Sequence, residues 1–160
     1  MNEGKRLLVL GIGNRLCRDD GIGSVLAERL SHRTEHENVD IIDGGTIGLG
    51  LLYLFESYSD VIIIDSTDAG AEPGTLIWYS LHDLEATEGE GKVSHHQSGV
   101  LDLLSHARLM GCLPKNVILL GIQVAAIEPE MGLSEEMRER LPMLETCVEE
   151  EIGHWLKTNA

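Results

Sequence analysis

The chain has 160 residues, the size of one ordinary domain, and carries 27 acidic against 12 basic residues, for a formal charge of -15. This negative charge repels phosphate backbones and anionic lipid surfaces, which argues against nucleic-acid binding and membrane-surface binding. No apolar run reaches membrane-spanning length, so we expect a soluble, intracellular (cytoplasmic) protein.

Five β-rich runs alternate with segments of helical spacing. In chain order the runs are RLLVLGIG, VDIID, DVIIIDS, TLIWYS and NVILLGIQV. The first, third and last are nearly continuous apolar runs, which is typical of strands covered on both faces. The helical segments between them are residues 21–30, 48–58 and 98–110. We interpret Asp20, Thr46 and Ser98 as their caps. The alternation predicts a single α/β domain with a largely parallel sheet and helices on both faces.

The last third of the chain predicts one more helix and one loop. The segment SEEMRERLPMLETCVEEEIGHWL places its apolar residues on one side at helical spacing. It predicts a helix docked on the core, with its glutamates mainly on a solvated face. Pro142 predicts an interruption or a start of this helix near Leu141. The earlier stretch HDLEATEGEGKVSHHQ predicts a mobile loop of functional length.

The opening motif GIGNRLCRDDGIG looks at first like a nucleotide-binding glycine turn. The dinucleotide fingerprint GxGxxG requires a glycine three residues after Gly13, where this chain has Leu16. Asp19 and Asp20 stand where a phosphate would meet the helix N-terminus, so one anion would face another. Asp43 could correspond to the acidic residue that binds the ribose of a dinucleotide, but without the glycine pattern this signal is weak. The sequence therefore argues against a dinucleotide site.

Polar residues follow the predicted strands at the carboxyl edge of the sheet, where open α/β sheets bind ligands. In the usual doubly wound orders, the strands that carry Asp20 and Asp65 are neighbours. Taken alone, Asp20 has an alternative role as a helix N-cap, and Asp65 has one as a turn anchor. Together with the imidazole of His95 or His96, the two carboxylates form a donor set suited to nickel, zinc or manganese. Three protein ligands leave a coordination position open for a substrate.

Cysteine and serine chemistry gives weaker alternatives. Cys17, Cys112 and Cys147 are far apart and form no CxxC pair, which argues against a disulfide framework and a thiolate zinc site. Activation of Cys17 or Ser66 by His96 is a nucleophilic alternative, but the chain has no GxSxG elbow. We rank it below the metal-linked site and interpret Cys17 as a partly buried loop anchor.

Five motifs, in order over nearly the whole chain, carry a family resemblance. They are LVLGIGNRLCRDDGIG, IIDGGTIGLGLL, VIIIDSTDAGAEPGTL, SHHQSGVLDLL and VILLGIQVAAIEPEMGLSEE. Together they resemble the hydrogenase maturation endopeptidases, which process the large subunit of nickel-iron hydrogenases. The resemblance implies a twisted five-stranded sheet between helices. It also implies removal of a short C-terminal extension from the large-subunit precursor after nickel insertion, with the nickel presented by the precursor.

The resemblance also implies the site residues. The family's metal-contacting residues are an acid in the first loop, an Asp at the end of the third strand and a His before a later helix. These fall on Asp20, Asp65 and His96. Some members have Glu where this chain has the shorter Asp20, and the spacing HQ-S/L-G favours His96 over His95. These three residues are therefore expected to serve both metal recognition and catalysis.

The remaining expectations concern supporting residues, nickel and partners. Asp43, in the DGG motif, is interpreted as a positioning residue, and Asp19 as one that faces solvent or supports the turn. Nickel is expected either to act as a Lewis acid or to lower the pKa of a bound water. Alternatively it only positions the substrate, and a carboxylate is the general base. The expected partner is the large-subunit precursor, and the protein is expected to be a monomer. The alternative function is a non-enzymatic chaperone that holds nickel or the precursor in the same crevice.

Overall fold

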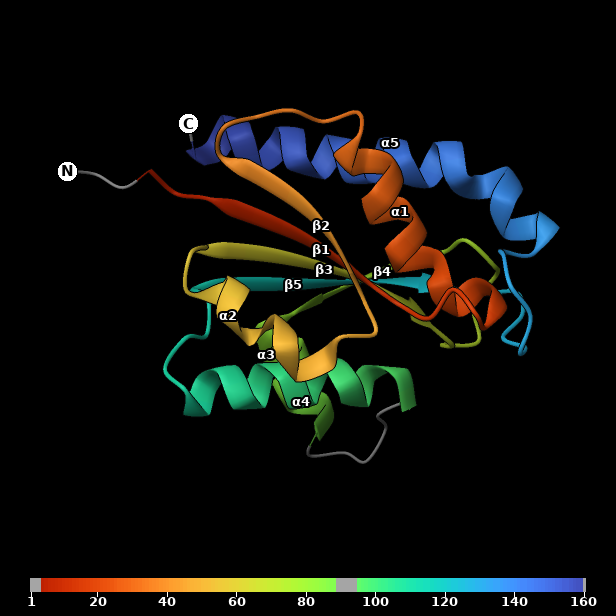
Figure 1. Cartoon of the computed structure of the whole chain (residues 1–160), viewed down its shortest axis with the longest axis horizontal. Coiled ribbons are helices and arrows are strands. Elements are labelled where there is room, and N and C mark those ends of the chain that lie inside the picture. Colours follow the sequence, from red (N-terminus) through yellow and green to blue (C-terminus); the bar gives the residue numbers. More distant parts are fainter. Residues whose placement is uncertain (1–3, 89–94, 160) are drawn as a thin grey trace.

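The fold is built on one sheet of five strands (Figure 1). A computed structural model describes residues 4–88 and 95–159, and it describes side chains for residues 4–86 and 99–159. The strands lie in the order β2-β1-β3-β5-β4. They are β1 (Leu7–Ile12), β2 (Val39–Gly45), β3 (Asp60–Thr67), β4 (Leu76–Ser80) and β5 (Asn116–Gln123). Only β4 runs antiparallel to its neighbour, so the prediction of a mostly parallel sheet is confirmed.

Helices cover both faces of the sheet, as predicted. In chain order the helical elements are η1 (Arg18–Gly21), α1 (Ile22–Ser31), η2 (Gly48–Leu51), α2 (Leu52–Phe55), α3 (Leu81–Glu88), α4 (His95–Leu109) and α5 (Glu135–Asn159). Figure 1 shows α1 and α5 on one face, and α2, α3 and α4 on the other. In the described parts of the chain, no helix has the length and apolar character needed to cross a membrane.

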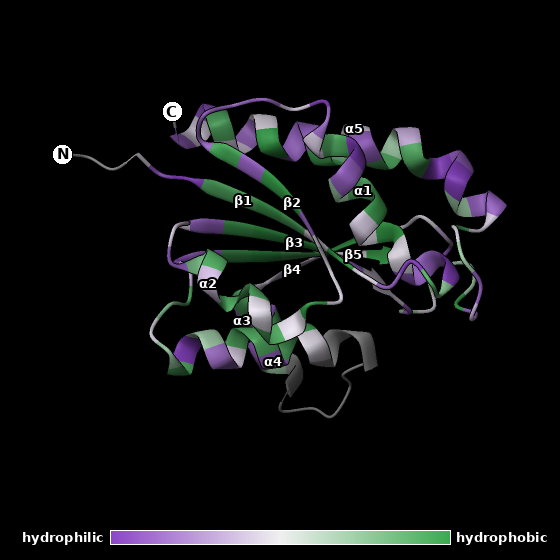
Figure 2. Cartoon of the chain, in the orientation of Figure 1, coloured by the Kyte–Doolittle hydropathy of each residue, from purple (hydrophilic) through white to green (hydrophobic). Residues whose placement is uncertain are grey.

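Alternate residues of each inner strand pack into two separate cores. On β1, Leu7 and Val9 contact the core formed with α1 and α5. Leu8 and Leu10 contact the core on the side of α2, α3 and α4. Figure 2 shows the inner strands as largely hydrophobic between helices of mixed character. This two-sided burial explains why β1, β3 and β5 read as nearly continuous apolar runs.

The three predicted caps are wrong. The residue that precedes α1 is Gly21, and no side chain caps this helix, so Asp20 is not an N-cap. Ile47 precedes η2, again with no side-chain cap, and Thr46 has no such role. Ser98 lies inside α4, which begins three residues earlier at His95. The carboxylate of Asp20 instead accepts from the Ser66 hydroxyl and the Asn14 amide.

The stretch predicted as a mobile loop is helical at its start. Leu81–Glu88 forms α3, and the stretch ends in the first turn of α4. Residues 89–94, between the two helices, lie outside the described residues. The prediction of a loop is therefore wrong for the start and for the end of the stretch.

The C-terminal helix is unbroken, contrary to the prediction at Pro142. α5 runs through Pro142, which removes the backbone donor to the carbonyl of Arg138. Both residues are exposed, so solvent can replace the lost bond. The glutamate face also has an exception, because Glu145 is only 1% exposed. Its carboxylate pairs with Arg29 of α1 and with Arg33.

Two glycines allow α1 to cross the sheet at very short range. A Cβ on Gly11 would lie 2.1 Å from the carbonyl oxygen of Gly23. A Cβ on Gly23 would lie 2.2 Å from the carbonyl oxygen of Ile64. Because no side chain fits at this crossing, α1 and the η1 turn before it sit directly on the ends of β1 and β3. This fixes the position of Asp20, which lies in η1.

We expect Gly23→Ala to lower the free energy of unfolding by about 3 kcal/mol, because the added methyl must displace backbone atoms. Urea denaturation measures the effect. Gly153→Ala in α5 is the matched control, since its Cβ would meet nothing within 4 Å. There we expect a gain of about 0.5–1 kcal/mol from helix propensity. Equal stability of Gly23→Ala and the wild type would contradict the close crossing.

Candidate active site

Two carboxylates meet at the carboxyl edge of the sheet. Asp65 lies near the end of β3, and Asp20 lies in the turn that follows β1; these strands pair side by side. The hydroxyl of Ser66 donates to Oδ1 of Asp20 at 2.8 Å, and the amide of Asn14 donates to its Oδ2 at 3.2 Å. The amide of Ser66 donates to Oδ1 of Asp65 at 2.8 Å. Ser66 therefore joins the two acids, and the predicted neighbourhood of their strands is confirmed.

Both acids line one pocket of about 180 Å³. The lining comes from the segments that follow β1 and β2 and from α4, and besides the two acids it includes Gly13, Asn14, Gly45, Thr46, Gly48, Gly99 and Leu103. Most of these residues are small, so few side chains fill the space beside the two carboxylates. The site therefore combines two neighbouring acids with a lining of mostly small residues.

The environment of Asp65 disfavours its charge. Only 7% of the residue is exposed, and this burial raises the pKa of its carboxyl well above the ordinary value. The charge of Asp20 raises the pKa further, while the hydrogen bond from the Ser66 amide lowers it. A cation placed between the two acids would reverse this balance, because it favours both ionised forms.

We expect Asp65→Asn to stabilise the fold at neutral pH. An acid whose pKa is raised on folding binds more protons in the folded state, so its contribution to stability falls as pH rises above its unfolded value of about 3.9. Asparagine carries no charge and keeps an oxygen that can accept from the Ser66 amide. Urea denaturation between pH 4 and pH 8 should give a flatter stability profile for the variant. A variant less stable than the wild type at pH 7.5 would contradict the assigned environment.

The predicted histidine ligand lies at the start of α4. His95 and His96 form the first turn of this helix, one turn before Gly99, which lines the pocket. Their side chains lie outside the described residues. Among the side chains that the structure describes, no group of three His, Cys, Asp or Glu residues is placed to hold a metal ion. The three-ligand set thus stays a prediction, with two of its members in one pocket.

Asp19 is fully buried, and its carboxylate has other partners than that of Asp20. One oxygen accepts from the amides of Ala125 and Ala126 at 3.1 and 2.8 Å, and from the hydroxyl of Ser134 at 2.9 Å. The other accepts from the Ser134 amide at 2.8 Å. Of the two expectations for Asp19, solvent exposure is wrong and support of the turn is right. Asp19 ties the turn after β1 to the segment between β5 and α5.

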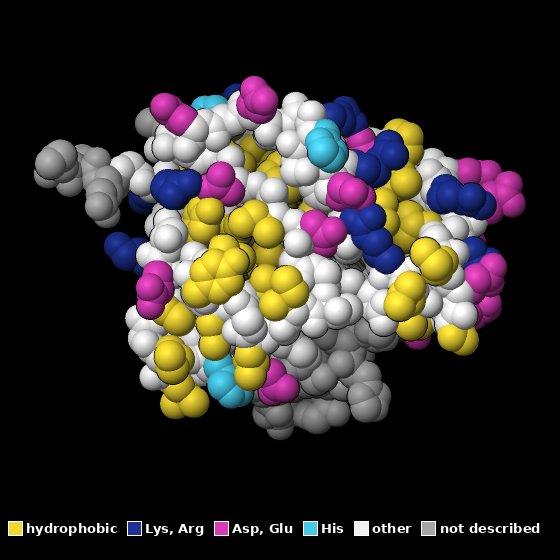
Figure 3. Space-filling view, in the orientation of Figure 1, with side chains coloured by type: hydrophobic (Ala, Val, Ile, Leu, Met, Phe, Trp, Pro, Cys, Tyr) yellow, Lys and Arg dark blue, Asp and Glu magenta, His cyan; other side chains and the backbone are white. Residues whose placement is uncertain are grey.

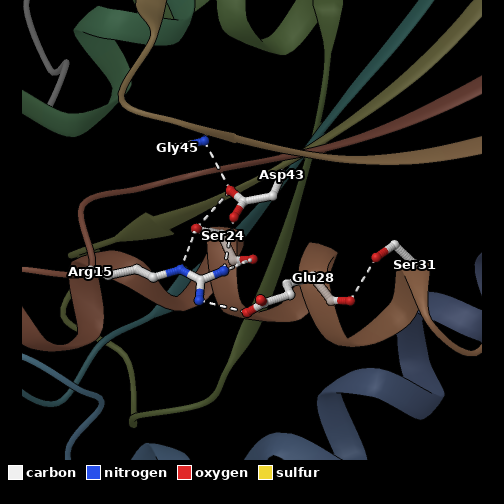
Figure 4. Close-up of polar contacts among 6 residues, drawn as sticks. All are labelled: Arg15, Ser24, Glu28, Ser31, Asp43 and Gly45. Carbon is white, nitrogen blue, oxygen red and sulfur yellow. Dashed lines mark hydrogen bonds and ion pairs between the residues drawn. The ribbon is translucent and has the colours of Figure 1, made fainter.

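Asp43 lies at the end of β2 and is held by a network that the sequence did not predict (Figure 4). Its Oδ2 accepts from Nη2 of Arg15 at 2.8 Å. Its Oδ1 accepts from the hydroxyl of Ser24 at 2.7 Å and from the amide of Gly45 at 3.0 Å. Arg15 also donates to Glu28 at 2.6 Å. Burial lowers the pKa of the guanidinium, but the two carboxylates outweigh this effect and raise it.

The nucleophilic alternatives gain no support from the geometry. Ser66 is 2% exposed, and its hydroxyl donates to Asp20. Cys17 is a free, partly buried cysteine that precedes η1, as its interpretation as a loop anchor requires. Ser66 instead serves as the link between the two acids, a role that its place directly after Asp65 could have indicated.

Comparison with known proteins decides the family. The family model described as HycI, hydrogenase maturation protease, matches residues 25–151. The chain belongs to the hydrogenase maturation protease family. The match covers three of the four predicted site residues, Asp43, Asp65 and His96, and begins shortly after Asp20. The chain is thus a member of a family of peptidases, as the five motifs imply.

Individual relatives agree with this membership. The chain is 41% identical over 129 residues to the hydrogenase expression/formation protein HupD of Rhodobacter capsulatus, covering 80% of this chain and 61% of that one. It is 35% identical over 150 residues to the hydrogenase 2 maturation protease of Escherichia coli, covering 92% and 89%.

Solved structures share the fold. The hydrogenase maturating endopeptidase HYBD from E. coli superposes with a TM-score of 0.75 at 32% identity, covering 89% of each chain. The hydrogenase maturation protease HycI from Thermococcus kodakarensis gives a TM-score of 0.77 at 25% identity, covering 93% of each chain. The predicted α/β fold with a five-stranded sheet is therefore confirmed.

Proposed function

We propose that this maturation protease removes the C-terminal extension of a nickel-iron hydrogenase large-subunit precursor after nickel insertion. We further propose that it recognises the precursor's nickel through Asp20, Asp65 and His96. The observation that carries the proposal is the shared pocket of Asp20 and Asp65, two acids from distant parts of the chain. Carboxylate and imidazole donors suit nickel, which here belongs to the substrate.

The electrostatics of the pocket support a cationic ligand. Burial and the charge of Asp20 both raise the pKa of the Asp65 carboxyl. A divalent cation carried in by the precursor would relieve the repulsion between the two acids. In the free protein the two close acids repel one another, and binding of the nickel-loaded precursor removes this repulsion. This favours the loaded precursor over the unloaded one.

Exposed apolar residues at the same edge of the sheet support a polypeptide substrate. They lie in the segments that follow β1, β2 and β5, and they are Leu16, Ile47, Leu49, Ile127 and Met131. Figure 3, in the orientation of Figure 1, shows apolar side chains on both sides of a group of charged residues. Exposed apolar side chains around a polar centre are typical of a protein-binding surface.

The decisive experiment separates a protease from a chaperone. Nickel-loaded precursor is incubated with one hundredth of its molar amount of this protein, and the large subunit is followed by intact mass. We expect complete loss of the C-terminal extension, because an enzyme turns over. A protein that only held nickel or the precursor would leave the polypeptide length unchanged, and that result would refute the proposed function.

A further inference from the structure

Arg15 joins three separate parts of the molecule beside the pocket. It lies in the turn after β1, and its guanidinium reaches α1 through Glu28 and Ser24, and the end of β2 through Asp43. Its Nε donates to the Ser24 hydroxyl at 2.7 Å, which in turn donates to Asp43. Figure 4 shows the guanidinium directed at all three partners. These contacts fix the carboxylate of Asp43 from two directions.

The residue that Asp43 holds in place is part of the pocket wall. The pairing of β1 with β2 shifts at this point, so that Gly11 lies opposite Asp43 but Ile12 lies opposite Gly45. Gly45 has a φ of +50°, and its amide donates to Asp43. Its carbonyl accepts from the amide of Gly13, which lines the same pocket. The irregular backbone of Gly45 therefore depends on the orientation of Asp43.

The balance of charge makes Arg15 necessary for this orientation. Asp43 and Glu28 both contact the guanidinium, and both carry negative charge in a chain with a formal charge of -15. Without the cation, the two carboxylates would repel one another, and Asp43 would keep only the Ser24 hydroxyl and the Gly45 amide as described partners. The turn after β2 would then be free to move away from the site.

We propose that Arg15 is a positioning residue for precursor processing. Through Asp43, it sets the wall formed by Gly45 and Thr46 at the correct distance from Asp20 and Asp65. The role of Arg15 in processing rests on the proposed function. Its effect on the backbone of Gly45 does not. A small displacement of a substrate-positioning wall lowers the reaction rate without unfolding the protein, because the reacting groups no longer align.

Arg15→Ala tests the proposal, with Arg6→Ala as the matched control. Arg6 pairs with Asp40 at 2.5 Å at the other end of the same two strands. Amide hydrogen exchange is measured at Gly45, and kcat and KM are measured with nickel-loaded precursor. We expect exchange at Gly45 to accelerate about tenfold and kcat/KM to fall about tenfold in Arg15→Ala alone, mainly through kcat. Arg15→Lys should restore part of the rate, since an ammonium keeps the charge but lacks the planar fork.

The outcomes separate the two proposals. Unchanged exchange at Gly45 in Arg15→Ala overturns the positioning role. Accelerated exchange with unchanged processing overturns it as well, because the wall is then not needed for the reaction. Failure of the wild type and Arg6→Ala to process the precursor overturns the proposed function, and with it any role of Arg15 in processing.

Discussion

Asp20→Asn and Asp65→Asn should each lower the rate of precursor processing at least about a hundredfold, the effect expected when a metal-contacting or general-base carboxylate is lost. Each substitution keeps the size of the side chain and removes its charge from the pocket. The measurement is the rate of appearance of mature large subunit at equal protein concentration. Because Asp65→Asn is expected to be the more stable protein at neutral pH, its loss of activity cannot come from unfolding.

Asp102→Asn is the control for this pair. Asp102 lies exposed on α4 and does not line the pocket, so its variant should process the precursor at the wild-type rate. Wild-type rates for both Asp20→Asn and Asp65→Asn would remove these carboxylates from the mechanism. Loss of activity in Asp102→Asn as well would show that the assay responds to overall charge.

Asp19→Ala should lower the free energy of unfolding by about 4 kcal/mol, a large fraction of the stability of an ordinary domain. The substitution leaves the amides of Ala125, Ala126 and Ser134 without their buried acceptor. Urea denaturation monitored by circular dichroism measures the loss, and Asp102→Ala is the exposed control. If Asp19→Ala lowered the free energy of unfolding as little as Asp102→Ala, the structural role of Asp19 would be contradicted.

Much of the fold could be predicted because its signals are local. The VIII of β3, for example, is apolar at successive positions, which is typical of strands buried on both faces. The order of strands and helices then brought Asp20 and Asp65 to one edge, since parallel strands end on the same side. The pocket was predictable to this extent, from strand ends and from the resemblance of five motifs.

Distant partners explain why the sequence did not predict the burial of Asp19 and of Glu145. Asp19 and Asp20 are adjacent and chemically identical, yet Asp19 binds the segment before α5 and Asp20 faces the pocket. Nothing in RDDG distinguishes them, because the donors that bury Asp19 come from the far end of the chain. Glu145 is buried for a similar reason, since its partners lie on and after α1. Pro142 does not interrupt α5, because a proline on an exposed helix face removes one backbone hydrogen bond that solvent can replace.

The most direct test of the central claim is to observe the nickel itself. Nickel K-edge X-ray absorption is recorded on nickel-loaded precursor whose scissile bond has been made resistant to cleavage, alone and in an equimolar complex with this protein. We expect added oxygen and nitrogen ligands in the complex, and their loss when Asp20→Asn and Asp65→Asn are combined. An intact complex in which the nickel spectrum is unchanged would contradict that claim.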